Sequence, residues 1–144
     1  MKIFVATPIS CFENEEQMLE YKESLIPFLC LLRKKHIVNA EIEKIDNNDY
    51  GEPAYSVRHD FGLITECDVF VIHYPNKIAT SALIELGYAV AFCKKIVIVV
   101  ENIETLPFLG QGLDSVYNNV SIVKHKNLDL NCAQLIIKLL ETQC

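Results

Sequence analysis

The sequence predicts an α/β fold, in which helices cover both faces of a parallel sheet. Short β-rich apolar runs alternate with segments of helical periodicity along the whole chain. Residues 68–73 form a continuous apolar run, as expected for a strand buried on both faces. The length of 144 residues suits a single domain, residues 1–144. Five strands in this length favour a flavodoxin-like (Rossmann-like) three-layer α/β/α sandwich with strand order 2-1-3-4-5.

The elements follow from local patterns taken in chain order. Strands are predicted over residues 2–6, 38–45, 68–73, 95–100 and 119–124, and helices over residues 13–35, 54–66, 81–92 and 130–140. Pro27 is expected to kink or divide the first helix. Alternation of apolar and polar residues in the second strand predicts a place near the sheet edge. Val57, Phe61 and Ile64 are expected to share the buried stripe of the second helix.

Charge and composition exclude several classes of function. The formal net charge is −6 and no basic stripe offsets it, so we expect no nucleic-acid partner. The six cysteines form no C-x-x-C pair and stand far apart, which is typical of reduced cytosolic thiols. The four histidines are isolated in sequence, so we expect no metal site and no cofactor.

Nothing in the sequence indicates export or a membrane partner. The N-terminal segment reaches Pro8 too soon to be a signal peptide. No stretch approaches the roughly 18 uninterrupted apolar residues of a membrane span. We therefore expect a cytoplasmic protein.

Glu85 is the only charged residue between positions 78 and 93. A helix that is apolar on nearly every side is expected to be buried on nearly every side, which would leave this carboxylate poorly hydrated. The helix macrodipole favours an anion in the first turns, so Glu85 is a candidate catalyst. The alternative, that it hydrogen-bonds a nearby loop, stays open. Gly87 is unfavourable in a helix interior by about 1 kcal/mol relative to Ala, and it indicates close helix–strand packing or a nearby ligand.

Further candidates lie around the expected switch point beyond the carboxyl ends of strands 1 and 3. Asp60 falls at the margin of a buried helical stripe and could face the same cleft as Glu85. Its alternative is an ordinary boundary acid paired with Arg58 or His59. The candidate substrate-binding residues are Thr7, Pro8, Ile9, Ser10, His73, Tyr74 and Ser81. For His73 a structural role is the alternative.

Three motifs together resemble the nucleoside 2-deoxyribosyltransferase family and the related 2′-deoxynucleoside 5′-monophosphate N-hydrolases. The first is Lys2-Ile-Phe-Val-Ala-Thr-Pro-Ile, and the second is Asp60 placed eight residues before Asp68-Val-Phe-Val. The third is Ile84-Glu-Leu-Gly-Tyr-Ala-Val-Ala, followed by Lys95-Ile-Val-Ile-Val. The resemblance covers most of the chain.

The resemblance implies a mechanism and a partner. The glutamate matching Glu85 attacks the anomeric carbon and forms a covalent glycosyl-enzyme, and the aspartate matching Asp60 assists protonation of the departing base. Water or a second base then releases the sugar, as in retaining glycoside hydrolysis. In the family an asparagine or serine of a neighbouring subunit completes the pocket. Asn119 stands at the matching place, which implies a homo-oligomer, a dimer or a tetramer.

Departures from the family pattern leave base transfer and hydrolysis both open. Ala79 stands where the transferases carry a second aspartate, and residues 141–144 lack their C-terminal aromatic. A TIR-like NAD glycohydrolase is an alternative, because Thr80-Ser81 and Glu85-Leu86 have a compatible spacing. A catalytically inactive nucleotide-binding relative is another. A receiver module is disfavoured by the missing acids after strands 1 and 3, and a dehydrogenase by the absence of G-x-G-x-x-G.

Overall fold

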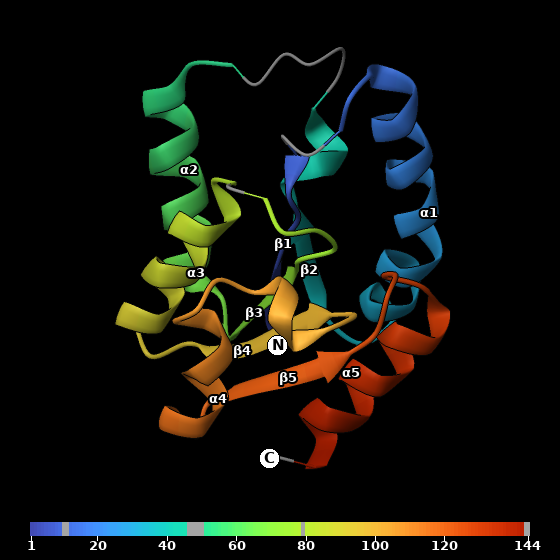
Figure 1. Cartoon of the computed structure of the whole chain (residues 1–144). Helices are drawn as coiled ribbons and strands as arrows, with labels where there is room; N and C mark the ends of the chain where they lie inside the picture. Colours follow the sequence, from blue (N-terminus) through green and yellow to red (C-terminus); the bar gives the residue numbers. More distant parts are fainter. Residues whose placement is uncertain (10–11, 46–50, 79, 143–144) are drawn as a thin grey trace.

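The computed structural model describes residues 1–9, 12–45, 51–78 and 80–142. Five parallel strands form one sheet in the order β2-β1-β3-β4-β5, which confirms the predicted topology (Figure 1). The strands are β1 (Lys2–Ala6), β2 (Ile37–Ala40), β3 (Val69–His73), β4 (Lys95–Val100) and β5 (Val120–Lys124). The α-helices are α1 (Glu15–Arg33), α2 (Pro53–Glu66), α3 (Ala82–Ala91), α4 (Leu113–Val116) and α5 (Leu130–Thr142). The 3₁₀ segments are η2 (Glu41–Lys44), η3 (Ile103–Thr105) and η4 (Gly110–Gly112).

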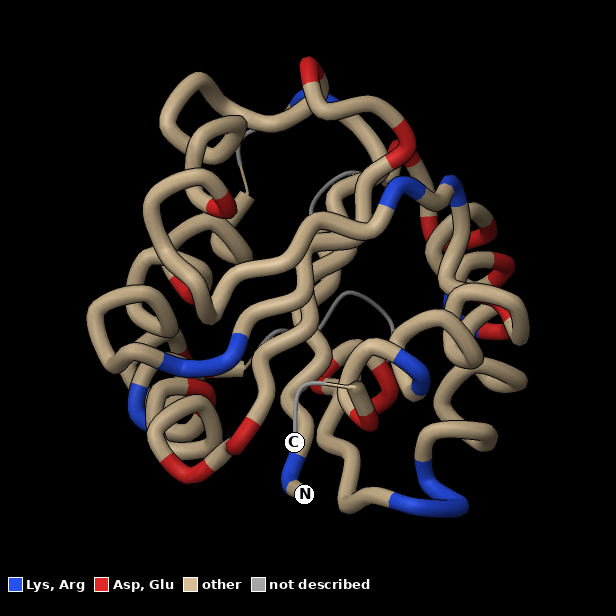
Figure 2. Tube along the Cα trace, turned by 90° about the horizontal axis from the view of Figure 1, so that it is seen from below, with Lys and Arg blue, Asp and Glu red and all other residues tan. Residues whose placement is uncertain are grey.

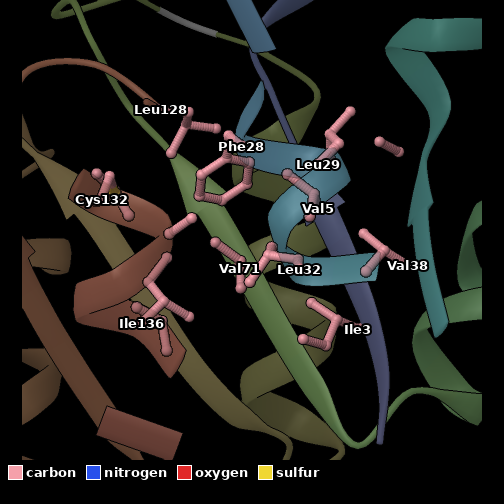
Figure 3. Packing of buried hydrophobic residues seen from close by; sticks show 14 of the residues in the cluster. Ile3, Val5, Phe28, Leu29, Leu32, Val38, Val71, Leu128, Cys132 and Ile136 are labelled. Atoms are coloured by element: carbon pink, nitrogen blue, oxygen red, sulfur yellow. The ribbon is translucent and has the colours of Figure 1, made fainter. Parts of the chain in front are cut away.

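Two apolar cores lie on the two faces of the sheet. Successive side chains of a strand point to opposite faces, so neighbours in β1 and β3 enter different cores. Val5 and Val71 pack on the side of α1 and α5, where Phe28 and Ile136 join them (Figure 3). The other core lies on the side of α2 and α3 and contains Phe4, Ala6, Ile64, Phe70, Ile72 and Leu86. Helices therefore cover both faces, as the alternating pattern predicted.

Charged side chains lie around this framework rather than across it. Lys and Arg form small, separate groups on the outer helices and loops, interspersed with Asp and Glu (Figure 2). The strands that cross the middle of the view carry charge only near their ends. No helix of the described segments is both long and apolar enough to cross a membrane.

The second strand is shorter than predicted, and the correction matters for the site. β2 pairs with β1 only from Ile37 to Ala40, and the last pair is Val5 with Ala40. The chain then turns into η2 at Glu41, although β1 continues to Ala6. The predicted strand through residue 45 is therefore wrong, whereas its position at the sheet edge is confirmed.

The first helix is not divided at Pro27. One α-helix runs from Glu15 to Arg33, and the side chain of Asn14 caps it by accepting a hydrogen bond from the backbone N–H of Gln17 at 2.9 Å. Pro27 lies on the exposed side of the helix, where water can satisfy the backbone group that proline leaves unpaired.

Burial on α2 and α3 differs from prediction at particular positions. Val57 is 52% exposed, because it lies in the first turns of α2, which extend beyond the strands (Figure 1). α3 buries one stripe, Ala82, Leu86 and Ala89, while Ile84 is 66% exposed. The expected burial of α3 on nearly every side is therefore wrong. A Cβ built on the exposed Gly87 meets nothing within 4 Å, so the close helix–strand packing inferred there is wrong as well.

Candidate active site

The carboxyl edge of the sheet gathers the side chains that the sequence singled out as candidate catalysts. In a doubly wound sheet this edge is the usual place for a ligand. Here α2 and α3 pack against each other, and α2 also contacts β1 while α3 contacts β3. The loop that leaves β3 crosses the same edge before it enters α3 (Figure 1).

Glu85 lies in the first turn of α3 and is partly buried. Its backbone N–H donates to the carbonyl of Ser81 at 3.2 Å, which fixes this residue inside the helix. The pKa of the Glu85 carboxyl is raised to about 7. Burial is the largest cause, and the negative charges of Asp60 and Glu41 also contribute. Its carboxylate has no hydrogen bond or ion pair with any residue in the described part of the chain. The alternative of a loop hydrogen bond therefore receives no support from these residues.

Asp60 lies on α2 and is also partly buried. Burial raises the pKa of its carboxyl, and the charge of Glu41 raises it too, while His59 and Lys44 act in the opposite direction. Among the described residues Asp60 forms no ion pair with Arg58 or His59, which was the alternative reading of this acid. Since its charge acts on Glu85, the two predicted acids lie within electrostatic range of each other.

Glu41 is a third acid of this region that sequence reasoning missed. It is the first residue of η2, and 18% of its side chain is exposed. One carboxylate oxygen accepts a hydrogen bond from Lys44 Nζ at 2.8 Å, and the other lies 3.4 Å from His59 Nε2. The only signal that could have found it is the end of β2, because a residue following a parallel strand lies at the ligand-binding edge.

His59 is not isolated in the fold, although it is isolated in sequence. Ligand-type atoms of Glu41, His59 and Asp60 lie within 4.8 Å of one another. Lys44 Nζ lies 2.8 Å from Glu41 and 3.2 Å from His59, so a positive charge already occupies this group. A second cation would meet electrostatic repulsion there, and we assign these residues to no metal site.

The residues after β1 divide between the two sides of the sheet edge. Thr7 and Pro8 are buried directly after the strand, at the switch point where they were expected. Ile9 packs against the core on the side of α1 and α5, away from α3. Ser10 lies outside the described residues.

His73 is a satisfied buried group. It is 1% exposed, and its Nε2 lies 2.9 Å from the carbonyl of Lys126, which can only accept a hydrogen bond. The proton is therefore on Nε2, and Nδ1 accepts from the hydroxyl of Tyr21 at 2.5 Å. Burial lowers the pKa of His73 to about 4, so the ring is neutral near pH 7. It lines a cavity of about 290 Å³ on the side of α1, together with Phe12, Gln17, Tyr21, Pro75, Asn76 and Asn127.

Tyr74 holds the loop that leads to α3. It is 1% exposed, and its hydroxyl donates to the carbonyl of Ile78 and accepts from the backbone N–H of Ile78 at 3.2 Å. Both hydrogen-bonding functions of the hydroxyl serve this loop. Tyr74 therefore contributes shape to the edge, whereas Ser81 is exposed just ahead of α3 with no capping hydrogen bond from its side chain.

Asn119 lies at the opposite edge of the sheet. Its side-chain amide donates to the carbonyl of Lys94 at 2.6 Å, at the amino ends of β4 and β5. Within one chain it is therefore separated from Glu85 by the length of the strands. A role for Asn119 in the pocket of a neighbouring subunit stays a prediction.

Comparisons with solved structures agree with the resemblance seen in the sequence. The structure of Clostridium botulinum CMP N-glycosidase, BcmB, matches over 96% of this chain and 99% of that chain, with a TM-score of 0.67 and 25% identity. A 2-desoxiribosyltransferase from Leishmania mexicana matches over 70% of this chain and 65% of that chain, with a TM-score of 0.49 and 17% identity. No protein-family model matches the sequence, and no curated protein matches it. The likeness to the CMP N-glycosidase, which spans almost the whole of both chains, confirms the predicted resemblance.

Proposed function

We propose that this protein cleaves the N-glycosidic bond of a nucleoside, a 2′-deoxynucleoside or a 5′-monophosphate of either, with Glu85 as nucleophile and Asp60 as acid. The observation that carries the proposal is a pair of partly buried carboxyls at the carboxyl edge. Neither has a hydrogen bond or ion pair in the described part of the chain, and both bind a proton more tightly than usual. Unpartnered acids with raised pKa values are typical of catalytic sites.

The first step forms a glycosyl ester. An ionised oxygen of Glu85 attacks C1′, the bond between C1′ and the base nitrogen breaks, and its electron pair leaves with the base. Asp60 donates its proton to the base, which departs neutral. Splitting one displacement into two in this way lowers each barrier.

The second step returns both acids to their starting states. A water oxygen attacks C1′, the ester bond to Glu85 breaks, and the carboxylate of Asp60 takes the proton of the water. The products are the free sugar or sugar phosphate and the enzyme with Glu85 ionised. A second base in place of water would give transfer, with its own N–H proton passing to Asp60.

One proton must be divided between the two acids in the resting enzyme. Two carboxylates that repel each other in a partly buried site do not both ionise readily, so a proton remains on one of them near neutral pH. Glu85 competes for this proton, since its own pKa is raised to about 7. The proposed mechanism uses the form that carries the proton on Asp60 and leaves Glu85 ionised. This form provides an acid for the base and a nucleophile for the sugar at the same time.

Similarity to a CMP N-glycosidase over almost the whole chain supports hydrolysis of a nucleoside 5′-monophosphate as the first activity to test. Transfer to a second base remains part of the proposal. The family's second aspartate is replaced by Ala79, which lies outside the described residues.

A homo-oligomer is also proposed. The outer side of α3 and its end expose apolar side chains, with Ile84 66% and Phe92 48% exposed. Apolar surface of this kind is typical of contact faces between subunits. A neighbouring copy could then bring Asn119 to the pocket, as the family resemblance implies. A single domain over residues 1–144 and a cytoplasmic location remain predictions too.

A substrate screen tests the proposal. The purified protein is incubated with nucleosides, 2′-deoxynucleosides, their 5′-monophosphates and NAD, each with and without a second base, and free base is measured by chromatography. We expect release of base from at least one nucleoside or nucleotide, and none from the Glu85→Gln variant. Cleavage of NAD alone would favour the TIR-like alternative. No release from any compound would contradict the proposed activity.

A further inference from the structure

We propose that Glu41 acts as a positioning residue for a proton: its negative charge shifts the proton that the two acids share toward Asp60, and so away from the nucleophile Glu85. The inference rests on the proposed function for its role in catalysis. The charge effect itself can be measured without any substrate. Glu41 touches no reacting atom in this proposal and acts only through Asp60.

The geometry places Glu41 beside Asp60. Carboxylate oxygens of Glu41 and Asp60 belong to one group of side chains whose polar atoms lie within 4.8 Å of one another, with His59 as the third member. Glu85 is not part of that group. Charge–charge energy falls with distance, so an anion beside Asp60 favours protonation of Asp60 more than protonation of Glu85.

The causes of the raised pKa values agree with this proximity of Glu41 to Asp60. After burial, Glu41 is the largest cause of the raised pKa of Asp60. For Glu85, Glu41 is a smaller cause than Asp60 is. When the proton is on Asp60, that residue no longer repels the carboxylate of Glu85, and the nucleophile ionises more easily.

Among the described residues, four charged or titratable groups interact with Asp60. Glu41 and Lys44 approach from η2, His59 is its neighbour on α2, and the charge of Asp60 acts on Glu85 of α3. Lys44 and, when charged, His59 oppose the effect of Glu41. The ammonium of Lys44 is bound to Glu41 at 2.8 Å, so it holds the anion in place while it weakens its field.

Glu43 provides a matched control. It lies two residues from Glu41 in the same 3₁₀ segment, but it pairs with Arg33 of α1 through hydrogen bonds of 2.5 and 2.9 Å. It does not contribute to the pKa of Asp60 or of Glu85. Glu41→Gln and Glu43→Gln therefore remove the same charge from the same segment, and only the first removal should reach the two acids.

The primary test is a titration by NMR of protein labelled with ¹³C at the side-chain carboxyls of Asp and Glu. The signal of Asp60 is followed in the wild type, Glu41→Gln, Glu43→Gln and Lys44→Met. We expect Asp60 to lose its proton at lower pH in Glu41→Gln, at unchanged pH in Glu43→Gln, and at higher pH in Lys44→Met. An unchanged titration of Asp60 in Glu41→Gln, or an equal change in Glu43→Gln, would overturn the inference.

Base release gives the second readout. In Glu41→Gln the rate at pH 6 is expected to fall about tenfold, because more of the shared proton lies on Glu85 and fewer molecules combine a protonated Asp60 with an ionised nucleophile. Glu43→Gln should keep the wild-type rate within about twofold, and an equal fall in both variants would contradict the inference. If the wild type releases no base, the proposed function fails, whereas the NMR titration still decides whether Glu41 shifts the proton toward Asp60.

Discussion

Two polar groups at the carboxyl edge of the sheet have very different surroundings. His73 ends β3 and is almost completely buried, with Tyr21 bonded to one ring nitrogen and the carbonyl of Lys126 bonded to the other. Glu85 follows one loop later at the start of α3, less deeply buried, with no such partner among the described residues.

This difference indicates that His73 is buried for a structural reason, whereas the burial of Glu85 needs another explanation. Burying a polar group is unfavourable unless its hydrogen bonds are restored, and the surroundings of His73 restore both. The surroundings of Glu85 do not, and two further acids lie close enough to raise its pKa. A site that raises the energy of an ionised side chain keeps that side chain reactive. By this criterion we propose that the active site lies on the side of α2 and α3.

The largest effect is expected for Glu85→Gln. Loss of the nucleophile should lower the rate of base release at least about a thousandfold, because the amide cannot form the glycosyl ester. Chromatography of the released base measures the rate, and circular dichroism checks the fold. A folded variant that releases base at more than a tenth of the wild-type rate would remove Glu85 from the mechanism.

Asp60→Asn should have the next largest effect. General acid catalysis contributes about 10²–10⁴-fold, so we expect the rate of base release to fall about a hundredfold at pH 6. The variant should also lose the decline of the rate at high pH that deprotonation of Asp60 causes. Rates measured from pH 5 to pH 8 test both points, and a wild-type profile in the variant would contradict the assignment.

Stability should respond to Glu85 in the opposite direction from activity. In the folded state burial raises the pKa of Glu85 to about 7 from a usual value of 4.5, so the folded protein holds a proton that the unfolded chain releases. The wild type therefore loses stability as the pH rises from 4.5 to 7. Since glutamine has no such penalty, Glu85→Gln should be more stable than the wild type by about 2 kcal/mol at pH 8, and about equal to it at pH 4.

Urea denaturation at the two pH values measures this difference. The control is Glu23→Gln, which changes an exposed glutamate on α1. It should show no gain at pH 8. Equal stability of Glu85→Gln and the wild type at both pH values would mean that Glu85 is not strained in the fold.

The smallest effect on base release is expected for a change beside His73. Tyr21→Phe removes the donor to His73 Nδ1, so the free energy of unfolding should fall by about 1–2 kcal/mol. Base release per folded molecule should stay within about twofold of the wild type. A tenfold fall in base release without loss of stability would instead assign the cavity beside His73 to the substrate.

Local patterns were sufficient for the fold, because strands and helices here follow the periodicity of their own residues. The sheet order was predicted from the alternation of elements, together with the number of strands and the length of the chain. The error at β2 arose because the alternation of apolar and polar residues over 38–45 continues past Ala40, where the chain leaves β1 and forms a 3₁₀ segment.

The site was predictable only in part. Glu85 was singled out because it is a lone charge in an apolar helix. The reason given was incomplete, because α3 is exposed on one side and the charges of Asp60 and Glu41 add to the effect of burial on the pKa of Glu85. Glu41 was missed because it was placed inside a strand. The partners of His73 lie 52 and 53 residues away along the chain, where no local pattern can indicate them.

The central claim is that Glu85 bonds covalently to C1′. Its direct test is mass spectrometry of the protein quenched with acid during turnover of its best substrate in the screen, followed by proteolysis. The claim predicts a glycosyl group on the peptide that contains Glu85, absent from the Glu85→Gln variant. Rapid turnover with unmodified peptide at every quench time, or a glycosyl group on another residue, would contradict it.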